Sequence, residues 1–428
     1  MSRSSRLQGF YNRTLEERRA MLADWLGLPA EAVNEITSGE VFRVELADVL
    51  VENAIGTFAL PLAIAANFRI NGRDRLVPMV IEESSVVAAS SHAAKLLREG
   101  EGIVARATEQ QMIGQLQLIE VPQALDLAEL LARNESELIA MLNANHPRLG
   151  AVGGGARTLE ARRIDDGSRR WHVVHLVVDV ADAMGANIVN TMLERLAPRL
   201  EELSGARVHL KILSNLSDRR RVDVVGRVPI ALLAPYGESG RHVAENVELA
   251  SRFAEVDPYR AATHNKGIMN GVDATLLATG QDFRAVEAGA HAYAARNGRY
   301  SALSTWRVEE EALVGRMTIP LAVGTVGGMT VLHPAVNRIL EWFDLTRARE
   351  LAEVVAAVGL AQNLAALLAL STEGIQRGHM SLHARNVAFS IGARGDELEA
   401  LVASMSREND FSERYASELL ADLRATHG

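Results

Sequence analysis

The stretch GQLQLIEV at residues 114–121 begins the part of the chain whose pattern decides the fold. Its apolar and polar residues alternate as they do in a half-buried strand. The elements expected from here on are a strand at 114–121, a helix at 123–143, strands at 157–164 (RTLEARRI) and 171–180 (WHVVHLVVDV), a helix at 183–203 and a strand at 207–213 (RVHLKIL). This β-α-β-β-α-β order is that of ferredoxin-like domains, so we expect an inserted domain of this kind.

The segments on either side of the insert are predicted to form one larger, helix-rich domain. The fold class is therefore α+β, with a large domain at 1–108 and 216–373, a ferredoxin-like domain at 109–215 and a mobile helical C-terminal segment at 374–428. Further helices are expected at 13–26, 84–98, 284–297 and 346–370. Ser84 or Ser85 would offer the N-cap oxygen of the second of these helices. Glycines in the stretch 374–397 are typical of turns between short helices and indicate a lid.

The composition excludes several classes of function. The chain has 428 residues, of which 48% are hydrophobic, so two or three domains are expected. A formal net charge of -9 argues against a protein that tracks nucleic-acid phosphates. The absence of cysteine excludes disulfides, thiolate zinc sites and a cysteine nucleophile. The N-terminus lacks the apolar core of a signal peptide, and no apolar run of bilayer length is recognised, so a cytoplasmic location without a membrane anchor is expected.

Lysine is rare in this chain. Of 45 basic residues, only Lys95, Lys211 and Lys266 are lysine, and the others are arginine. An ammonium can shift its pKa and release a proton, whereas a guanidinium cannot. Lys266 is therefore a candidate proton donor, although a lysine retained by chance explains this single feature equally well.

The segment Asp182–Asn187 lies between an apolar strand and a long helix. A strand-to-helix turn directs free N–H groups and the positive end of the helix toward whatever lies above it, and Gly185 permits close approach of a ligand. A dinucleotide pyrophosphate could sit here, but an Asp182 side chain that merely caps the helix fits the pattern as well. The glycine run at 150–156 is a second expected loop. Neither stretch matches GxGxxG, and no GxxxxGK[ST] occurs.

Two other stretches carry charged groups in patterns suited to proton transfer. HNKG at 264–267 follows DPYR at 257–260, and GQD at 280–282 lies shortly downstream. Interleaved cationic, acidic and amide residues are expected where an anion is bound and a proton is donated. Glu82 and Glu83 end an apolar strand, where solvated carboxylates are also common. His379 and His383 share a helical spacing, but without an HExxH frame or cysteine we expect no metal site.

These stretches in combination carry a family resemblance. They resemble 3-hydroxy-3-methylglutaryl-coenzyme A (HMG-CoA) reductases in content, order and spacing over nearly the whole chain, and specifically the soluble class II bacterial form. The matching stretches are ENAIGT at 52–57, NGR at 71–73, EESSVVAA at 82–89, DAMGAN at 182–187, DPYRAATHNKG at 257–267, GQD at 280–282 and GHM at 378–380.

The resemblance implies a set of site residues. The catalytic residues would be Glu83, Lys266, Asp282 and His379. The small domain would bind NAD or NADP through Asp182, Met184, Gly185 and Asn187, and the acyl group would contact Arg260, Ser85, Asn215 and Asn270. The family works as a homodimer with its active site at the subunit interface, which allows Glu83 and Lys266 to come from different chains.

Two positions depart from the family pattern. Ser84 stands where proline is usual, which relaxes the backbone beside Glu83. The loop Asn145–Arg148 lacks the acidic residue that NAD-preferring members use to bind the adenosine ribose, and no carboxylate lies between Glu137 and Glu160. With His146 and Arg148 in its place, we expect NADP(H) to be accepted at least as well as NAD(H).

The implied reaction interconverts HMG-CoA with mevalonate and coenzyme A by two hydride transfers, through a hemithioacetal and mevaldehyde. Lys266 would stabilise the oxyanion and donate a proton, held by Asp282, while Glu83 exchanges protons and His379 protonates the departing thiolate. Two other functions fit parts of the pattern, namely a non-catalytic acyl-CoA- and dinucleotide-binding homodimer and a dehydrogenase for another acyl-CoA. The set of four candidate catalytic residues argues against the first, and Arg260 against the second. The physiological direction is not encoded.

Overall fold

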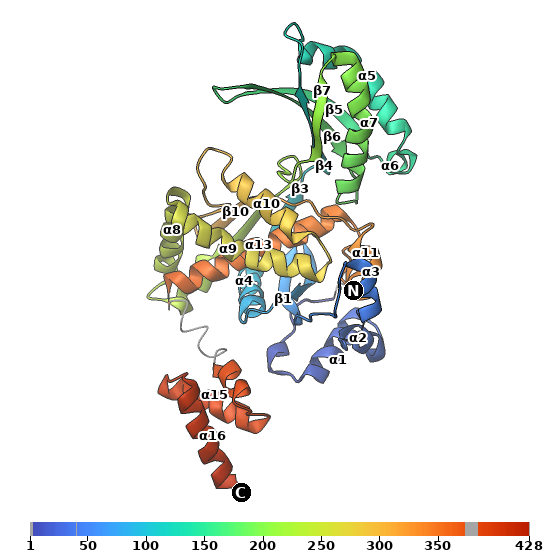
Figure 1. The fold of residues 1–428 in the computed structure, drawn as a ribbon. Helices are drawn as coiled ribbons and strands as arrows, with labels where there is room; N and C mark the ends of the chain where they lie inside the picture. Colours follow the sequence, from blue (N-terminus) through green and yellow to red (C-terminus); the bar gives the residue numbers. More distant parts are fainter. Residues whose placement is uncertain (1–2, 40, 373–383, 428) are drawn as a thin grey trace.

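The computed structural model describes residues 3–39, 41–372 and 384–427, and Figure 1 shows their arrangement. Two sheets organise this part of the chain. A six-stranded sheet has the order β2-β1-β3-β8-β10-β9, and a four-stranded sheet has the order β5-β6-β4-β7. Each sheet has its own cluster of buried apolar side chains. The α+β class is confirmed.

The four-stranded sheet follows the element order expected from the sequence. Its elements are β4 (Gln111–Ile119), α5 (Leu127–Ala144), α6 (Pro147–Ala151), β5 (Gly155–Asp165), β6 (Arg170–Asp179), α7 (Ala186–Ser204) and β7 (Arg207–Leu213). All neighbouring strands are antiparallel, and α5 and α7 pack against the sheet through buried leucines. The short helix α6 was not predicted. It starts with Pro147 at its first turn, where the missing N–H of proline costs nothing.

The six-stranded sheet explains how a second domain can be inserted. Its strands are β1 (Leu62–Ile70), β2 (Arg73–Val80), β3 (Ile103–Ala107), β8 (Arg221–Pro229), β9 (Ser304–Glu309) and β10 (Ala312–Pro320). The chain leaves this sheet at the end of β3 and returns on β8, and Ala107 pairs directly with Val222. Because the two crossing points are adjacent, the insert leaves the ladder of the large sheet intact. The boundaries 109 and 215 stay a prediction.

Helices surround the six-stranded sheet (Figure 1). They are α1 (Leu15–Leu26), α2 (Ala30–Thr37), α3 (Val44–Leu50), α4 (Val86–Glu99), α8 (Gly240–Val256), α9 (Pro258–Ala278), α10 (Phe283–Ala294), α11 (Met329–Leu332), α12 (Pro334–Trp342) and α13 (Ala348–Ser371), with 3-10 turns at Phe10–Asn12 and Ile230–Tyr236. The four helices expected outside the insert are all present, within a few residues of their predicted ends.

Helix α13 corrects the expectation that no stretch reaches bilayer length. It has 24 residues and carries no charge from Val354 to Thr372, and among the described residues it alone is long and apolar enough to cross a membrane. However, 72% of its most apolar window is buried inside the protein, where the helix packs against α9, α4 and the sheet. Its composition is therefore that of the central core helix of the large domain.

The start of α4 differs from the prediction. The helix begins at Val86, and no side chain caps it. Ser85 has a φ of +71°, which non-glycine residues rarely adopt, and its hydroxyl donates to the carbonyl of Ser84 at 2.6 Å. Ser85 therefore occupies the N-cap position as expected, but its oxygen does not cap the helix, because its hydroxyl is turned toward the Ser84 carbonyl.

The C-terminal part forms a separate helical unit, drawn apart from the large domain in Figure 1. It contains helical residues 384–390, α15 (Asp396–Glu408) and α16 (Glu413–His427). Ala388, Leu401, Met405 and Leu420 are among the buried residues of its own small core. His379 and the rest of the segment 373–383 lie outside the described residues.

Candidate active site

Glu83 and Lys266 form an ion pair, although 183 residues separate them in sequence. Glu83 follows strand β2, and Lys266 lies midway along α9, with 3.0 Å between Lys266 Nζ and Glu83 Oε2. The two side chains remain 38% and 61% exposed. Such a solvated pair contributes little to stability. Both residues of this ion pair belong to one chain, so the pair forms without the second subunit that the family resemblance allowed for.

One face of α9 carries candidate site residues, and the opposite face packs into the protein. Lys266, Asn270 and Asp273 follow one another at spacings that place them on one helix face. His264 lies on the buried side, and its Nε2 is 2.7 Å from Ser304 Oγ. Burial, together with the nearby Arg260 charge, lowers the pKa of His264 to about 3. His264 is therefore a neutral packing residue at working pH.

The residue preceding Lys266 anchors the helix. Asn265 Nδ2 donates to Tyr300 Oη at 3.0 Å and to the Ser301 carbonyl at 2.9 Å, while its Oδ1 accepts from Leu303 N at 2.9 Å. Asn265 is fully buried. This set of contacts fixes the backbone position from which Lys266 extends.

Arg260 lies in the first turn of the same helix, whose N-cap is Asp257. Its guanidinium is half-buried, burial lowers its pKa, and it makes no ion pair or hydrogen bond within the described residues. A half-buried cation without a protein partner is suited to bind an anion. Of the other predicted acyl contacts, Asn270 lies one turn from Lys266, Ser85 follows Glu83 closely, and Asn215 is exposed after β7.

Asp282 does not contact Lys266 within this chain. Its carboxylate caps α10, accepting from Ala285 N at 3.1 Å, and it forms an ion pair with Arg284 at 3.2 Å. No ion pair joins it to Lys266 in the described residues. The expectation that Asp282 holds the lysine is therefore not met inside one subunit.

The turn Asp182–Asn187 connects β6 to α7 by a sharp backbone bend. Gly185 has a φ of +104°, and a Cβ there would lie 2.6 Å from the Val180 side chain, so glycine is required. No side chain caps α7. Asp182 caps a different helix, since its Oδ1 accepts from Ala348 N, the first residue of α13, at 2.9 Å. The alternative that Asp182 caps its own helix is thus wrong.

The loop that precedes the glycine run is partly ordered by α6. His146 is the residue before this helix, and its Nε2 is buried without a hydrogen-bond partner in the described residues. Burial and the nearby Arg195 charge lower the pKa of His146. Arg148 is exposed. Asn143 Oδ1 accepts from Ala156 N at 2.7 Å and so fixes the end of the glycine run.

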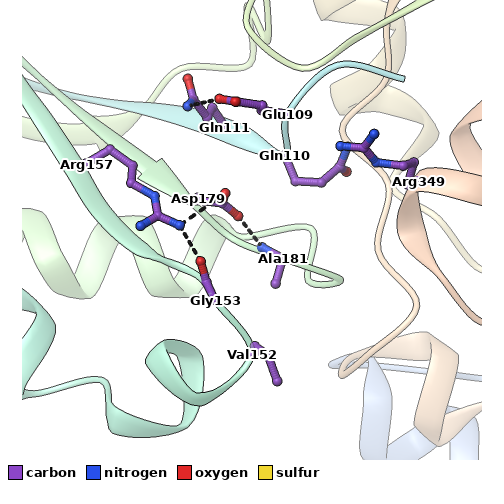
Figure 2. A pocket seen from close by; sticks show the side chains of 9 residues that line it. All are labelled: Glu109, Gln110, Gln111, Val152, Gly153, Arg157, Asp179, Ala181 and Arg349. Atoms are coloured by element: carbon purple, nitrogen blue, oxygen red, sulfur yellow. Dashed lines mark hydrogen bonds and ion pairs between the residues drawn. The ribbon is translucent and has the colours of Figure 1, made fainter. Parts of the chain in front are cut away.

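A cavity of 480 Å³ lies where the two domains meet (Figure 2). Its lining residues come from the start of β4, the glycine run, β5, the end of β6 and the start of α13. They are Glu109, Gln110, Gln111, Val152, Gly153, Arg157, Asp179, Ala181 and Arg349. Arg157 pairs with Asp179 Oδ2 at 3.4 Å, and the Asp179 carboxylate also accepts from Ala181 N. The cavity therefore adjoins the Asp182–Asn187 turn.

Comparison with known proteins decides the family. The sequence profile described as hydroxymethylglutaryl-coenzyme A reductase matches residues 14–384. The chain belongs to the HMG-CoA reductase family. A 3-hydroxy-3-methylglutaryl-coenzyme A reductase of Archaeoglobus fulgidus is 47% identical over 433 residues, covering 99% of this chain and 95% of the relative.

Solved structures agree with this assignment. The HMG-CoA reductase of Streptococcus pneumoniae has a TM-score of 0.83 and 42% identity, covering 97% of this chain and 99% of that one. A second structure, the class II reductase of Streptococcus pneumoniae bound to NADPH in open conformations, has a TM-score of 0.82 and 44% identity, with coverages of 85% and 99%. The chain is thus an HMG-CoA reductase and a nicotinamide-dependent oxidoreductase, as the resemblance implied.

The structure of the reductase also reveals site-supporting residues that the sequence did not single out. Arg220 is buried beside the Asp182–Asn187 turn, and Gln281 accepts from Gly324 N at 2.8 Å. Nothing distinguishes Arg220 from the many other arginines in the sequence. Gln281 stands next to Asp282 in the GQD stretch, and this adjacency is the one signal that could have identified it.

Proposed function

We propose that Lys266 is the group that stabilises the developing oxyanion of HMG-CoA and gives it a proton. The 3.0 Å contact between Lys266 Nζ and Glu83 Oε2 is the observation that carries this assignment. The contact brings a cationic proton donor beside a carboxylate, and both side chains remain partly exposed, which supports the assignment. When bound, the reduced nicotinamide would supply a hydride for each of the two reductions.

The protons balance across the two stages. In the first, the thioester oxygen takes a proton from Lys266 as the hemithioacetal forms. When the hemithioacetal collapses, its hydroxyl proton passes to Glu83, the C–S bond breaks and the thiolate of coenzyme A takes a proton from His379. In the second stage, the mevaldehyde oxygen takes back from Glu83 the proton that Glu83 received, and mevalonate forms. Lys266 and His379 regain their protons from solvent, which accounts for the two protons consumed. His379 enters this scheme by family resemblance alone.

The same proposal assigns the dinucleotide to the turn Asp182–Asn187. The uncapped amino end of α7 and the glycine at 185 suit a pyrophosphate, which binds backbone N–H groups. His146 lies in the loop before α6 and is proposed to contact the adenosine half of the cofactor. Met184 and Asn187 would contact the cofactor from the turn, and Arg148 from the start of α6.

Arg260 is proposed to bind the terminal carboxylate of the HMG group. The half-buried guanidinium lacks an anionic partner, and a carboxylate would compensate its desolvation through paired hydrogen bonds. Ser85, Asn215 and Asn270 would complete the contacts with the acyl group. Relative to wild type, an Arg260→Lys variant should lose affinity for HMG-CoA. Its affinity for free coenzyme A, which lacks the acyl carboxylate, should change less.

A second copy of the chain is proposed to complete the site by supplying Asp282. Within one chain the Asp282 carboxylate is used as the cap of α10 and as a partner of Arg284. The family stretch at 52–57 lies in an exposed segment that also contains Val49, Ile55 and Phe58, which are 81%, 102% and 90% exposed. Apolar side chains of this kind are expected to be covered in a homodimer.

Mixed dimers test this arrangement. Co-expression of Glu83→Gln with Lys266→Arg chains should give almost no activity, because both residues of a site come from one chain. Co-expression of Lys266→Arg with Asp282→Asn chains should restore about a quarter of wild-type activity, as expected for closed two-fold symmetry with random pairing. Restoration by the first mixture and none by the second would reverse the assignment.

A spectrophotometric assay tests the reaction itself. Oxidation of mevalonate with coenzyme A, and reduction of HMG-CoA, should both proceed with a nicotinamide cofactor. Comparison of the two rates at equal saturation measures which direction the enzyme favours kinetically. A cytoplasmic location is part of the proposal, and recovery of the activity in the membrane fraction of lysed cells would contradict it.

A further inference from the structure

Arg220 is a buried arginine at the junction of the two domains. It is 1% exposed and directly precedes β8, on the segment that returns from the insert. Its Nε donates to Gln110 Oε1 at 2.9 Å, and its Nη1 donates to the carbonyls of Ala183 and Met184 at 3.1 and 3.0 Å. Its Nη2 donates to the carbonyl of Val323. One guanidinium thus joins the entry to the insert, the proposed cofactor turn and the large domain.

The charge of Arg220 is unusual for its surroundings. No carboxylate forms a hydrogen bond or ion pair with it among the described residues, and Asp179 and Asp182 act only at longer range. Burial lowers its pKa to about 10, so it stays charged at neutral pH. Burying a charge without an ion pair is costly, and an apolar residue could fill such a position at lower cost. A role beyond packing is therefore expected.

The hydrogen bonds of Arg220 fix two peptide planes of the turn. Both carbonyls, at Ala183 and Met184, point toward Nη1. The chain has no cis peptide bond in its described part, so each N–H points opposite to the carbonyl of the same peptide. The N–H groups of Met184 and Gly185 therefore point away from Arg220, and the buried cation adds positive potential at the amino end of α7.

The same contacts connect the turn to the segment that carries Asp282. Val323, an acceptor for Arg220, precedes Gly324, whose N–H donates to Gln281 Oε1 at 2.8 Å. A Cβ at position 324 would lie 2.3 Å from Met184 N, so only glycine permits this close packing. Thr325 N donates to the Asp182 carbonyl at 2.8 Å. The turn is thus held against the large domain by backbone groups.

We propose that Arg220 is a positioning residue for the nicotinamide cofactor, which orients the Ala183–Met184–Gly185 peptides for the pyrophosphate and fixes them relative to Gln281 and Asp282. This inference rests on the proposed function of the turn as the cofactor seat. Arg220 itself is buried behind the turn and acts through the backbone that it orients.

The test is cofactor affinity measured without turnover. Arg220→Lys keeps the charge, but one ammonium cannot serve Gln110, the turn and Val323 in the geometry of a guanidinium. We expect its Kd for NADPH, from fluorescence titration, to rise about tenfold, the worth of one or two lost hydrogen bonds. The Kd of Arg220→Lys for HMG-CoA should change by less than about twofold. Arg220→Met should bind NADPH more weakly than Arg220→Lys does.

Arg75 provides the matched control. It is also a buried arginine that donates to two carbonyls, those of Phe343 and Asp344, both at 3.0 Å. Unlike Arg220 it also forms ion pairs, with Asp344 and Glu350, and within the described residues none of its hydrogen bonds or ion pairs joins it to the turn or to Gln281. Arg75→Met should lower the melting temperature and leave the NADPH affinity of the folded enzyme unchanged. If Arg220→Met does not fold, Arg220→Lys and Gln110→Leu carry the test, since each leaves a buried guanidinium or ammonium at the junction.

The outcomes separate this inference from the proposed function. Gly185→Ala disturbs the turn directly, and weaker NADPH binding in this variant would support the turn as the cofactor seat. Unchanged NADPH binding by Gly185→Ala would overturn the assignment of the turn and the inference with it. If Gly185→Ala binds NADPH weakly while Arg220→Lys binds it within twofold of wild type, only the role of Arg220 is overturned. If Arg220→Lys lost affinity for NADPH and for HMG-CoA equally, the role of Arg220 would also be overturned, because equal losses indicate general destabilisation of the protein.

Discussion

The Glu83–Lys266 pair and the Asp182–Asn187 turn are the two halves of the proposed site, and they are held in opposite ways. The first consists of two solvated side chains that meet at 3.0 Å. The second consists of backbone groups held by a buried arginine and by the packing of Gly324. The charges of Glu83 and Lys266 are partly exposed to solvent, whereas the charge of Arg220 is buried behind the turn.

The difference follows from what each half must do. A proton donor must reach the substrate and be reprotonated between the two reductions, so its side chain stays accessible until the acyl-CoA covers it. A cofactor seat must present fixed N–H groups, and rigid backbone positions reduce the entropy that binding costs. We therefore expect changes at the exposed half to affect turnover most, and changes at the buried half to affect cofactor affinity.

The largest expected effect is at Lys266. Lys266→Arg keeps the positive charge beside Glu83 but cannot release a proton at working pH, so turnover should fall by roughly three to four orders of magnitude in both directions. Steady-state assays would measure this, with size-exclusion chromatography to verify the assembly. Lys211→Arg, at an exposed position of β7, is the matched control and should be silent. Activity of Lys266→Arg within about tenfold of wild type would reject Lys266 as the proton donor.

The next effect separates the two reductions. His379→Gln should leave the reduction of added mevaldehyde largely intact, because that step expels no thiolate. Reduction of HMG-CoA should fall by about two to four orders of magnitude, the usual worth of a positioned general acid. Glu83→Gln should slow both reactions. Equal losses in both reactions for His379→Gln would instead assign this histidine to cofactor positioning.

A smaller effect concerns the loop at His146 and Arg148 and the choice of cofactor. With His146 and Arg148 in the loop, kcat/KM for NADP(H) should at least match that for NAD(H). His146→Asp should shift the ratio toward NAD(H) by about tenfold, because a carboxylate binds the ribose hydroxyls and repels a 2'-phosphate. Kinetics with both cofactors provide the test. A wild-type preference for NAD(H) above about a hundredfold, roughly 2.7 kcal/mol, would show that another group selects the cofactor.

The smallest effect concerns a half-buried acid, Asp273, on the face of α9 that carries Lys266. Burial, and then the neighbouring Glu287, raises the pKa of Asp273 to about 8. Glu287 in turn pairs with His291, whose pKa this contact raises. The folded chain therefore keeps a proton on Asp273 that the unfolded chain releases above about pH 4. The resulting stabilisation is complete below that pH and is lost as the pH rises through 8.

Replacement by an amide tests this directly. The melting temperature of Asp273→Asn should rise relative to wild type between pH 5 and 8, by on the order of 1–2 °C. Asp48→Asn, at an exposed position of α3, is the control and should follow the wild-type curve. Parallel melting curves for Asp273→Asn and wild type would show that Asp273 is already ionised in the folded protein.

The sequence by itself determined the elements and their order. The pattern of apolar and polar residues in 114–213 predicts the strands and helices of the insert. The strands of its antiparallel sheet lie within a few residues of the predicted ends. The stretch DAMGAN was placed correctly between β6 and α7, because the glycine and the change from strand to helix period are local signals. The family, and with it the activity, also followed from short stretches in a fixed order.

Only the tertiary structure decided which of these residues meet. Glu83 and Lys266 come together in one chain, Asp282 caps α10 away from Lys266, and Asp182 caps α13 across the domain junction. Arg220 became visible as a junction residue only when its acceptors were brought together from three separate segments. The physical reason is that periodicity and turn chemistry act over a few residues, whereas these contacts depend on packing between elements distant in the chain.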